Sequence, residues 1–314
     1  MANKNSVRRI AICNFKGGVG KTVLSVNLAA GLASREKKSG EPYRVLLIDA
    51  DAQSNASTYM LGQEVWEESI YPNPGLTLYG MIHEAVNHSR KSIEMTDIRG
   101  GPESGIFGNG AAWPSLYLLP AHYNLALAEE LLKREEPLNL AGKTSAIAPH
   151  KLLTTLLARI ENQFDFIILD CPPNIYHVTR NALYFADEIV IPVIPDWLSV
   201  SGLTWLILTL GEQFKRVGQS KTVRAIVPTL WNAAAFYENQ MDRITNKLHT
   251  EWKVNPAFKN LLSGCKFWEP GLMRHVDVAD AVGKYRPLTD FGQKNRSRQQ
   301  IETMVDELIG KKSK

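Results

Sequence analysis

The sequence predicts an α/β fold, a single domain in which a mostly parallel, twisted sheet is covered by helices on both faces. Short apolar runs typical of buried strands alternate with helical patterns through most of the 314 residues, and this alternation indicates βαβ units. A glycine-rich loop joins the first strand to the first helix, and acidic residues end later strands. With 44% hydrophobic residues, the chain can bury a sizeable core.

The first half of the chain begins this pattern. RRIAICN at 8–14 predicts a buried strand, and residues 22–36 are apolar almost all round, which predicts a buried helix. RVLLIDAD at 44–51 predicts a second buried strand, and a short helix is expected at 76–86. Residues 99–115 are rich in Gly, Pro and Ser, so we expect a loop insertion there.

The second half continues the alternation. Its apolar runs predict strands and its longer patterns predict helices: strands at 116–121, 164–173, 188–195 and 223–230, and helices at 126–136, 151–163 and 205–218. A final helix at about 297–311 has apolar residues along one face. The alternative is a membrane-surface helix, but the polar face mixes acids with bases, which favours a helix that packs on the core. We therefore expect one domain over residues 1–314.

Composition excludes several classes of protein. No apolar run reaches the 18 residues of a membrane span, and the N-terminus lacks the apolar core of a signal peptide, so we expect a cytoplasmic protein without membrane insertion. Three cysteines without C-x-x-C spacing argue against a disulfide framework or a zinc knuckle. A net charge of +4 and a pI of about 8.8 are compatible with binding to polyanions. They are equally compatible with an ordinary solvated surface.

The loop between the first strand and the first helix is a candidate phosphate-binding site. It comprises Gly17, Gly18, Val19, Gly20, Lys21 and Thr22. Glycines let backbone N–H groups approach phosphate oxygens, and the following helix adds the positive end of its dipole. Lys21 is expected to reach the β- and γ-phosphates of a nucleotide, and the Thr22 hydroxyl to bind Mg²⁺. Phe15 stands where the usual motif has its first glycine, so only the strand–loop–helix setting matches fully.

Three aspartates follow strands that should end near this loop. Asp49 and Asp51 close one strand and Asp170 closes another, and ligands in parallel sheets lie beyond the carboxyl ends of the strands. Asp170 follows an apolar run, as the magnesium-binding acid of such sites does, and is expected to hold Mg²⁺ through water. Asp51 is the candidate that orients the attacking water, with Asp49 a second acid beside the metal. For Asp49 and Asp51 the alternative is a turn or cap residue.

Four segments together resemble those of the ParA-type ATPases, which have a deviant Walker A loop and are related to MinD and the nitrogenase iron protein. They are KGGVGKT (16–22), LLIDADAQSN (46–55), LYLLPAHYNLALAEE (116–130) and FDFIILDCPPN (164–174). The resemblance returns more weakly at 228–232 and 273–281. It implies ATP and Mg²⁺ as cofactors, with slow hydrolysis.

The resemblance also implies a role for the second lysine of the loop. In this family the early lysine, here Lys16, crosses the face-to-face interface of a homodimer and contacts the nucleotide of the other subunit. A cation donated in this way neutralises charge much as an arginine finger does, so assembly would depend on ATP. The alternative is a solvated charge near the phosphates.

Other residues of the family pattern are only partly kept in this chain. The D-P-Q-G-N of relatives is Asp51-Ala52-Gln53-Ser54-Asn55 here, so this switch loop has lost a proline and a glycine. Val23 adjoins the nucleotide site where relatives often have a threonine that contacts the α-phosphate. Asn232 lies where the family tends to place an adenine contact, with a turn asparagine as the alternative.

DNA binding through the usual family residues is weakened in this chain. Asp277 stands at a position that is often basic in relatives, and three alanines at 233–235 replace a further basic position. A nearby basic cluster is a substitute candidate, because non-specific binding needs only several neutralised phosphates. The cluster consists of Lys284, Arg286, Lys294, Arg296 and Arg298. A solvated basic face is the alternative.

The leading hypothesis is an ATP-dependent homodimer that positions or segregates DNA or another cargo. By resemblance it binds DNA non-specifically on the nucleoid and is stimulated by a ParB-like or other adaptor protein. Alternatives are a nucleotide-switched regulator with little turnover, a MinD-like ATPase at the membrane, and a redox ATPase like the nitrogenase iron protein. The last would need two well-placed cysteines, and neither Cys13 nor Cys171 has the expected spacing.

Overall fold

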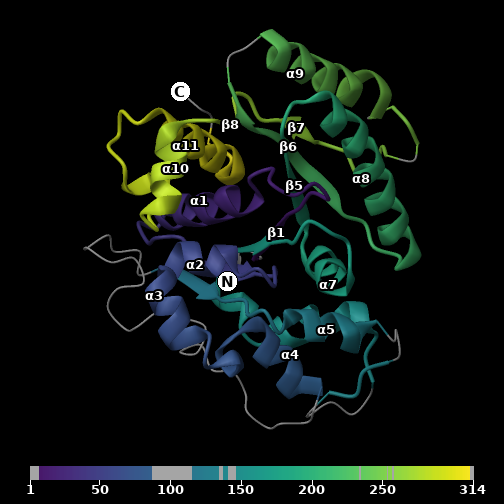
Figure 1. Cartoon of the computed structure of the whole chain (residues 1–314). Helices are drawn as coiled ribbons and strands as arrows, with labels where there is room; N and C mark the ends of the chain where they lie inside the picture. Colours follow the sequence, from purple (N-terminus) through teal and green to yellow (C-terminus); the bar gives the residue numbers. More distant parts are fainter. Residues whose placement is uncertain are drawn as a thin grey trace.

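The core of the molecule is an eight-stranded sheet in which every pairing is parallel (Figure 1). The computed structural model describes residues 7–86, 115–133, 137–140, 146–232, 235–252, 254–256 and 258–311. The strands follow the order β3-β2-β4-β1-β5-β6-β7, with β8 paired to β6. They are β1 (Arg8–Ile12), β2 (Val45–Asp49), β3 (Leu116–Leu119), β4 (Phe166–Asp170), β5 (Glu188–Val193), β6 (Thr222–Trp231), β7 (Lys266–Phe267) and β8 (Leu272–Met273). This confirms the predicted α/β fold with a parallel sheet.

Helices cover both faces of this sheet. They are α1 (Lys21–Ala33), α2 (Asn55–Leu61), α3 (Gln63–Val65), α4 (Leu78–Val86), α5 (Leu125–Leu132), α6 (Leu152–Leu157), α7 (His177–Phe185), α8 (Trp197–Arg216), α9 (Ala235–Lys247), α10 (Val276–Gly283) and α11 (Arg296–Ile309). Alternate residues of the central strands enter two separate cores: Ala11 of β1 lies in one, and Ile10 and Ile12 lie in the other. Because both faces are covered, the strands are near-continuous apolar runs.

The C-terminal helix α11 packs against α1 at a glycine. Val305 and Ile301 of α11 are fully buried, and a Cβ atom on Gly31 would lie 2.7 Å from Val305 Cγ2. The apolar face of α11 is therefore turned to the core and not to solvent. None of the helices in the described ranges is both long and apolar enough to cross a bilayer.

Several elements differ from the sequence-based expectations. Helix α8 begins at Trp197, eight residues before the predicted start, and α6 ends at Leu157, before the predicted 163. The predictions also did not include α2, α7, α9 and α10. The predicted insertion at 99–115 has only its last residue among those described.

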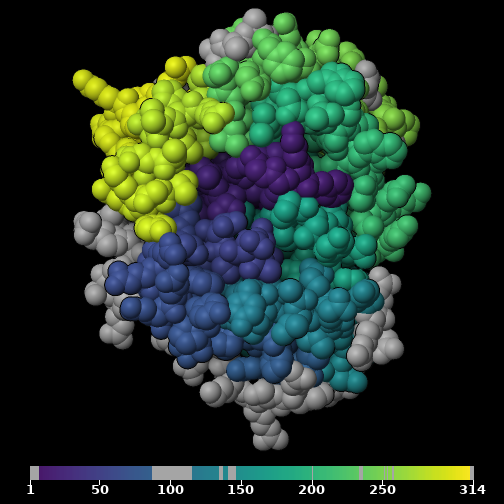
Figure 2. Space-filling view, in the orientation of Figure 1, coloured from purple at the N-terminus to yellow at the C-terminus, as the bar shows by residue number. Residues whose placement is uncertain are grey.

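The carboxyl end of β1 leads into the glycine-rich loop, in which Gly17 and Gly18 are exposed. In Figure 2, the N-terminal part of the chain (purple) reaches the surface between the C-terminal helices (yellow) and the middle of the chain (teal). The glycine-rich loop follows β1 directly, so the candidate site lies on this part of the molecule.

Candidate nucleotide-binding site

The glycine-rich loop turns sharply between β1 and α1. Gly18 and Gly20 have φ of 70° and 78°, a left-handed conformation that favours glycine. The loop is anchored from the opposite side, because Thr229 Oγ1 of β6 donates a hydrogen bond of 2.7 Å to the carbonyl of Val19. The turn is therefore held by β6 at Val19, with its backbone bent as a phosphate cradle requires.

The two lysines of the loop have different environments. Lys21 is 7% exposed, and its Nζ donates to the carbonyl of Lys16 at 3.0 Å. Burial lowers the pKa of Lys21, which Asp170 partly offsets. The Lys16 side chain is 40% exposed, and its Nζ lies 2.7 Å from Asp196 Oδ2 and 3.1 Å from Ser199 Oγ.

Asp196 is a site residue that the sequence reasoning did not identify. It caps α8 by accepting the Ser199 backbone N–H at 2.7 Å, and also holds Lys16. Burial raises the pKa of Asp196, but the hydrogen bonds from Lys16 and Ser199 lower it more, so that the net pKa is below its ordinary value. A signal was present in the sequence, since an aspartate directly before the apolar residues Trp197 and Leu198 is a typical N-cap of a helix.

Thr22 and Asp170 lie together, as predicted for a magnesium site. Thr22 Oγ1 donates to Asp170 Oδ2 at 2.8 Å, and Ser25, which was not predicted, donates to Asp170 Oδ1 at 2.8 Å. Asp170 is fully buried, and burial raises its pKa to about 6. A hydroxyl and a carboxylate beside a phosphate loop are the hard oxygen ligands that Mg²⁺ prefers, so these residues fit that ion.

Asp49 organises the switch loop. Its carboxylate accepts hydrogen bonds from the Asp51 N–H (3.1 Å), the Ser57 N–H (2.8 Å) and Ser57 Oγ (2.7 Å). Ser57 Oγ in turn accepts the Ala121 N–H at 2.8 Å, which links the switch loop to the end of β3. Burial and the neighbouring Asp170 raise the pKa of Asp49 to about 8.

Asp51 lies at the start of the altered switch loop. It is 9% exposed, and its Oδ1 accepts the Gln53 N–H at 3.0 Å. The lost glycine of the family pattern is Ser54, which still adopts a left-handed φ of 54°. The serine therefore keeps the backbone conformation that a glycine would favour.

The remaining predicted site residues lie in α1, directly after β6 and in the C-terminal part of the chain. Asn232 is exposed after β6, and Val23, in the first turn of α1, is partly buried against the core. In the basic cluster, Lys284 pairs with Asp280 at 2.7 Å, Arg286 with Asp290 at 3.3 Å and Arg298 with Glu302 at 2.8 Å. Lys294 and Arg296 are exposed.

Two buried thiols flank the site. Cys13 and Cys171 follow β1 and β4 and are buried, and burial raises the pKa of Cys13 to about 12. Within the described ranges, no group of three or more His, Cys, Asp or Glu side chains is arranged to hold a metal ion. The thiols therefore remain protonated at neutral pH and belong to the core.

Comparisons with known proteins agree with this geometry. The sequence profile of a family described as an AAA domain matches residues 7–222. The chain is 30% identical over 300 residues to the sporulation initiation inhibitor protein Soj of Bacillus subtilis, covering 95% of this chain and 97% of that protein. It is 28% identical over 287 residues to the chromosome-partitioning ATPase Soj of Thermus thermophilus, with 90% and 94% covered.

Solved structures share the fold over nearly the whole length. The McdA–ATP complex of Cyanothece has a TM-score of 0.69 at 19% identity, covering 99% of both chains. A putative plasmid partition protein of Borrelia burgdorferi bound to AMPPNP has a TM-score of 0.67 at 16% identity, covering 97% of this chain and 99% of that one.

The parallel sheet and the bent loop that carries Lys16 and Lys21 define a P-loop ATPase of the deviant Walker A type. Together with the profile match and the near full-length similarity to Soj, they identify the family. The chain belongs to the ParA-type partition ATPases.

Proposed function

We propose that this chain is an ATP-switched positioning protein that pairs with a second copy when it binds ATP and Mg²⁺. The paired form binds DNA non-specifically on the nucleoid, and slow hydrolysis, stimulated by an adaptor protein, separates the copies. The family membership supports a positioning ATPase. The McdA and Borrelia structures, which contain ATP and AMPPNP, support nucleotide binding.

The contrast between the two lysines carries the proposal. Lys21 is buried inside the loop, and there it would serve the nucleotide of its own subunit. Lys16 is 40% exposed, and its ammonium ion is held by partners on α8. An ion pair at such exposure is weak, so Lys16 can exchange Asp196 for the phosphates of a second subunit. Nucleotide would then favour assembly through a direct charge contact.

The other predicted residues have complementary roles in this cycle. Thr22 and Asp170 would hold Mg²⁺, which neutralises phosphate charge when bound. Asp51 would orient the attacking water, and the Asp49–Ser57 hydrogen bonds fix the backbone from which Asp51 projects. The left-handed backbone of Ser54 supports a switch loop that is shaped like those of its relatives.

The test is ATPase activity with and without DNA, in the wild type and in Asp51→Ala. We expect a slow rate that DNA raises, and loss of that rate in the variant while ATP binding is retained. Asp242→Ala, an exposed acid on α9, is the matched control and should keep the wild-type rate. Absence of hydrolysis by the wild type under every condition would favour the nucleotide-switched regulator instead.

A further inference from the structure

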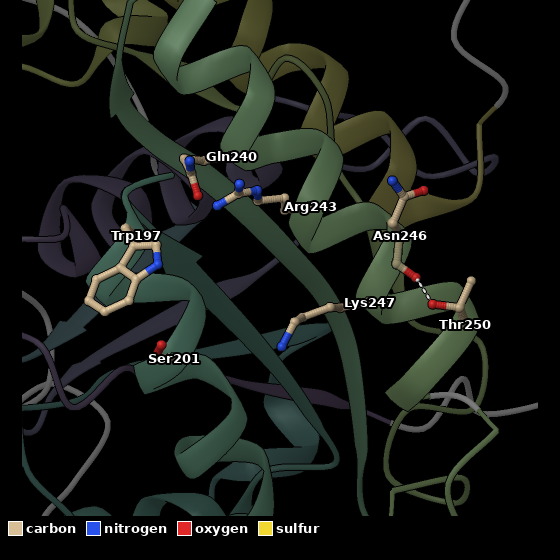
Figure 3. A pocket seen from close by; sticks show the side chains of 7 residues that line it. All are labelled: Trp197, Ser201, Gln240, Arg243, Asn246, Lys247 and Thr250. Carbon is tan, nitrogen blue, oxygen red and sulfur yellow. Dashed lines mark hydrogen bonds between the residues drawn. The ribbon is translucent and has the colours of Figure 1, made fainter.

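A cleft between α8 and α9 lies outside the nucleotide site. Its volume is about 380 Å³. Side chains from both helices line it: Trp197 and Ser201 from α8, Gln240, Arg243, Asn246 and Lys247 from α9, and Thr250 beyond α9. Figure 3 shows Trp197 on one side, with Arg243 and Gln240 opposite it and Lys247 extending toward α8.

The α8 side of the cleft presents an aromatic ring to solvent. Trp197 is 62% exposed, which leaves a large flat surface in contact with water. Its indole ring lies at the edge of the cleft (Figure 3). An exposed indole of this kind is a stacking surface for a planar group, because every nucleic-acid base has a π-face that stacks on aromatic rings.

The α9 side supplies positive charge and hydrogen-bonding groups. Arg243 and Lys247 are four residues apart, so they lie on one helix face about one turn apart. Gln240 is only 5% exposed, and its Oε1 has no hydrogen-bond partner among the described residues. A buried amide oxygen without a partner is unfavourable. If the Gln240 side chain rotates, its Oε1 can accept a hydrogen bond from a donor on a bound molecule.

We propose that this cleft binds a single-stranded nucleic-acid segment. One base stacks on Trp197 and offers N–H groups to Gln240, while Arg243 and Lys247 each contact a backbone phosphate. The chemistry fits this ligand because a flat π-surface, two cations one turn apart and side-chain amides are together what unpaired nucleotides require.

An acidic peptide is the other ligand that the positive charges of Arg243 and Lys247 could attract. Peptide docking needs a cluster of apolar anchor pockets. Trp197 is the one apolar side chain among the seven that line the cleft, and the other six are polar or charged. The lining therefore favours a stacked base over an apolar peptide side chain.

The site is complete within one subunit, so the proposal does not depend on the ATP-dependent dimer. It also differs from non-specific duplex binding, because bases in a duplex are already stacked on each other. Binding of single-stranded DNA is expected in the nucleotide-free protein, and loss of ATP-dependent dimerisation would leave this binding unchanged.

The test is fluorescence anisotropy of a 5′-labelled 20-nucleotide oligo-dT with the nucleotide-free, full-length protein at low salt. Trp197→Ala should weaken binding by at least about fivefold, the lower end for loss of one stacked base, and Trp197→Phe should restore part of it. The double variant Arg243→Gln with Lys247→Gln should also make the slope of log K against log salt concentration shallower by about 1.4, because it removes two phosphate contacts to a single strand.

Two controls separate this site from its alternatives. Trp205 is on the same helix and 69% exposed but does not line the cleft, so Trp205→Ala should bind as the wild type does. Lys294→Gln with Arg296→Gln should likewise leave strand binding intact. Four results would each overturn the proposal. Two concern the site itself: equal losses in the Trp197 and Trp205 variants, or binding of duplex DNA only. The other two concern the ligand: full competition by thymidine monophosphate at an equimolar nucleotide concentration, or binding of a poly-glutamate peptide in place of oligo-dT.

Discussion

Two buried carboxylates at the nucleotide site should make the folded protein sensitive to pH. The folded-state pKa of Asp49, about 8, lies above its ordinary value of 3.8, so the folded protein keeps a proton that the unfolded chain has released. Between about pH 5 and about pH 8, the free energy of unfolding should therefore be greatest at the low end and fall as the pH rises. Each pKa unit by which the two states differ is worth about 1.4 kcal/mol.

Denaturant unfolding of the nucleotide-free protein across this pH range, at constant ionic strength, measures the effect. Asp49→Asn cannot ionise and should flatten the decrease. A free energy of unfolding that rises with pH in the wild type, or an unchanged slope in Asp49→Asn, would contradict the proposed origin of the pH dependence.

Ser25 should contribute to the magnesium-dependent step although it is not expected to contact the nucleotide. Its hydroxyl donates to Asp170 at 2.8 Å, and a hydrogen bond to a charged group contributes about 1.5–3 kcal/mol. Ser25→Ala should therefore weaken binding of an ATP analogue in the presence of Mg²⁺ by about tenfold, measured by calorimetric titration. Ser34→Ala, which removes a hydroxyl bonded to the Gly31 carbonyl of the same helix, should have no such effect.

At the residue scale, local patterns predicted the loop and the acids that end strands, but not their partners. Lys16 and Asp196 are 180 residues apart in the chain, as are Arg8 and Glu188. Asp170 meets Ser25 only because β4 lies beside β1 in the sheet. Strand order and register decide such pairs, and neither can be read from a single strand.

The contact between α1 and α11 gives a prediction at the scale of elements. Ala at position 31 would place its Cβ 2.7 Å from Val305 Cγ2 and 3.3 Å from Ile301 Cγ2, and β-branched side chains adapt poorly. Overpacking of this kind destabilises by about 1–3 kcal/mol. Gly31→Ala should lower the free energy of unfolding by about 1 kcal/mol or more, measured by denaturant titration.

Gly202 is the matched control, a helical glycine in α8 with no atom within 4 Å of an added Cβ. Gly202→Ala should stabilise the protein by about 0.5–1 kcal/mol, because alanine favours the helix. If both substitutions shifted stability in the same direction, helix propensity and not packing would control the α1–α11 contact.

At this same scale, buried strands were predicted more reliably than amphipathic helices. Strands buried on both faces, such as β2 and β4, are continuous apolar runs bounded by polar residues and are easily recognised. The first turns of α8 contain two serines and a glycine, which have weak helix propensity, so the predicted start was late. The two-residue strands β7 and β8 have no period of their own and depend on pairing with β6.

At the scale of the whole molecule, the fold leaves Lys16 of the glycine-rich loop partly exposed beside α8. The loop is anchored by β6 and holds Lys21 inside, while Lys16 is held at the rim by α8. In the proposed function, this arrangement would connect ATP binding to pairing through the Lys16 side chain. The decisive property is therefore what Lys16 contacts in the presence of a second copy.

The most direct test is sedimentation equilibrium of the wild type and of Lys16→Gln, each with a slowly hydrolysed ATP analogue and Mg²⁺. We expect a dimer for the wild type and a monomer for Lys16→Gln, with analogue binding retained in the variant. A wild type that stays monomeric at saturating analogue, or a Lys16→Gln variant that dimerises as tightly as the wild type, would contradict it.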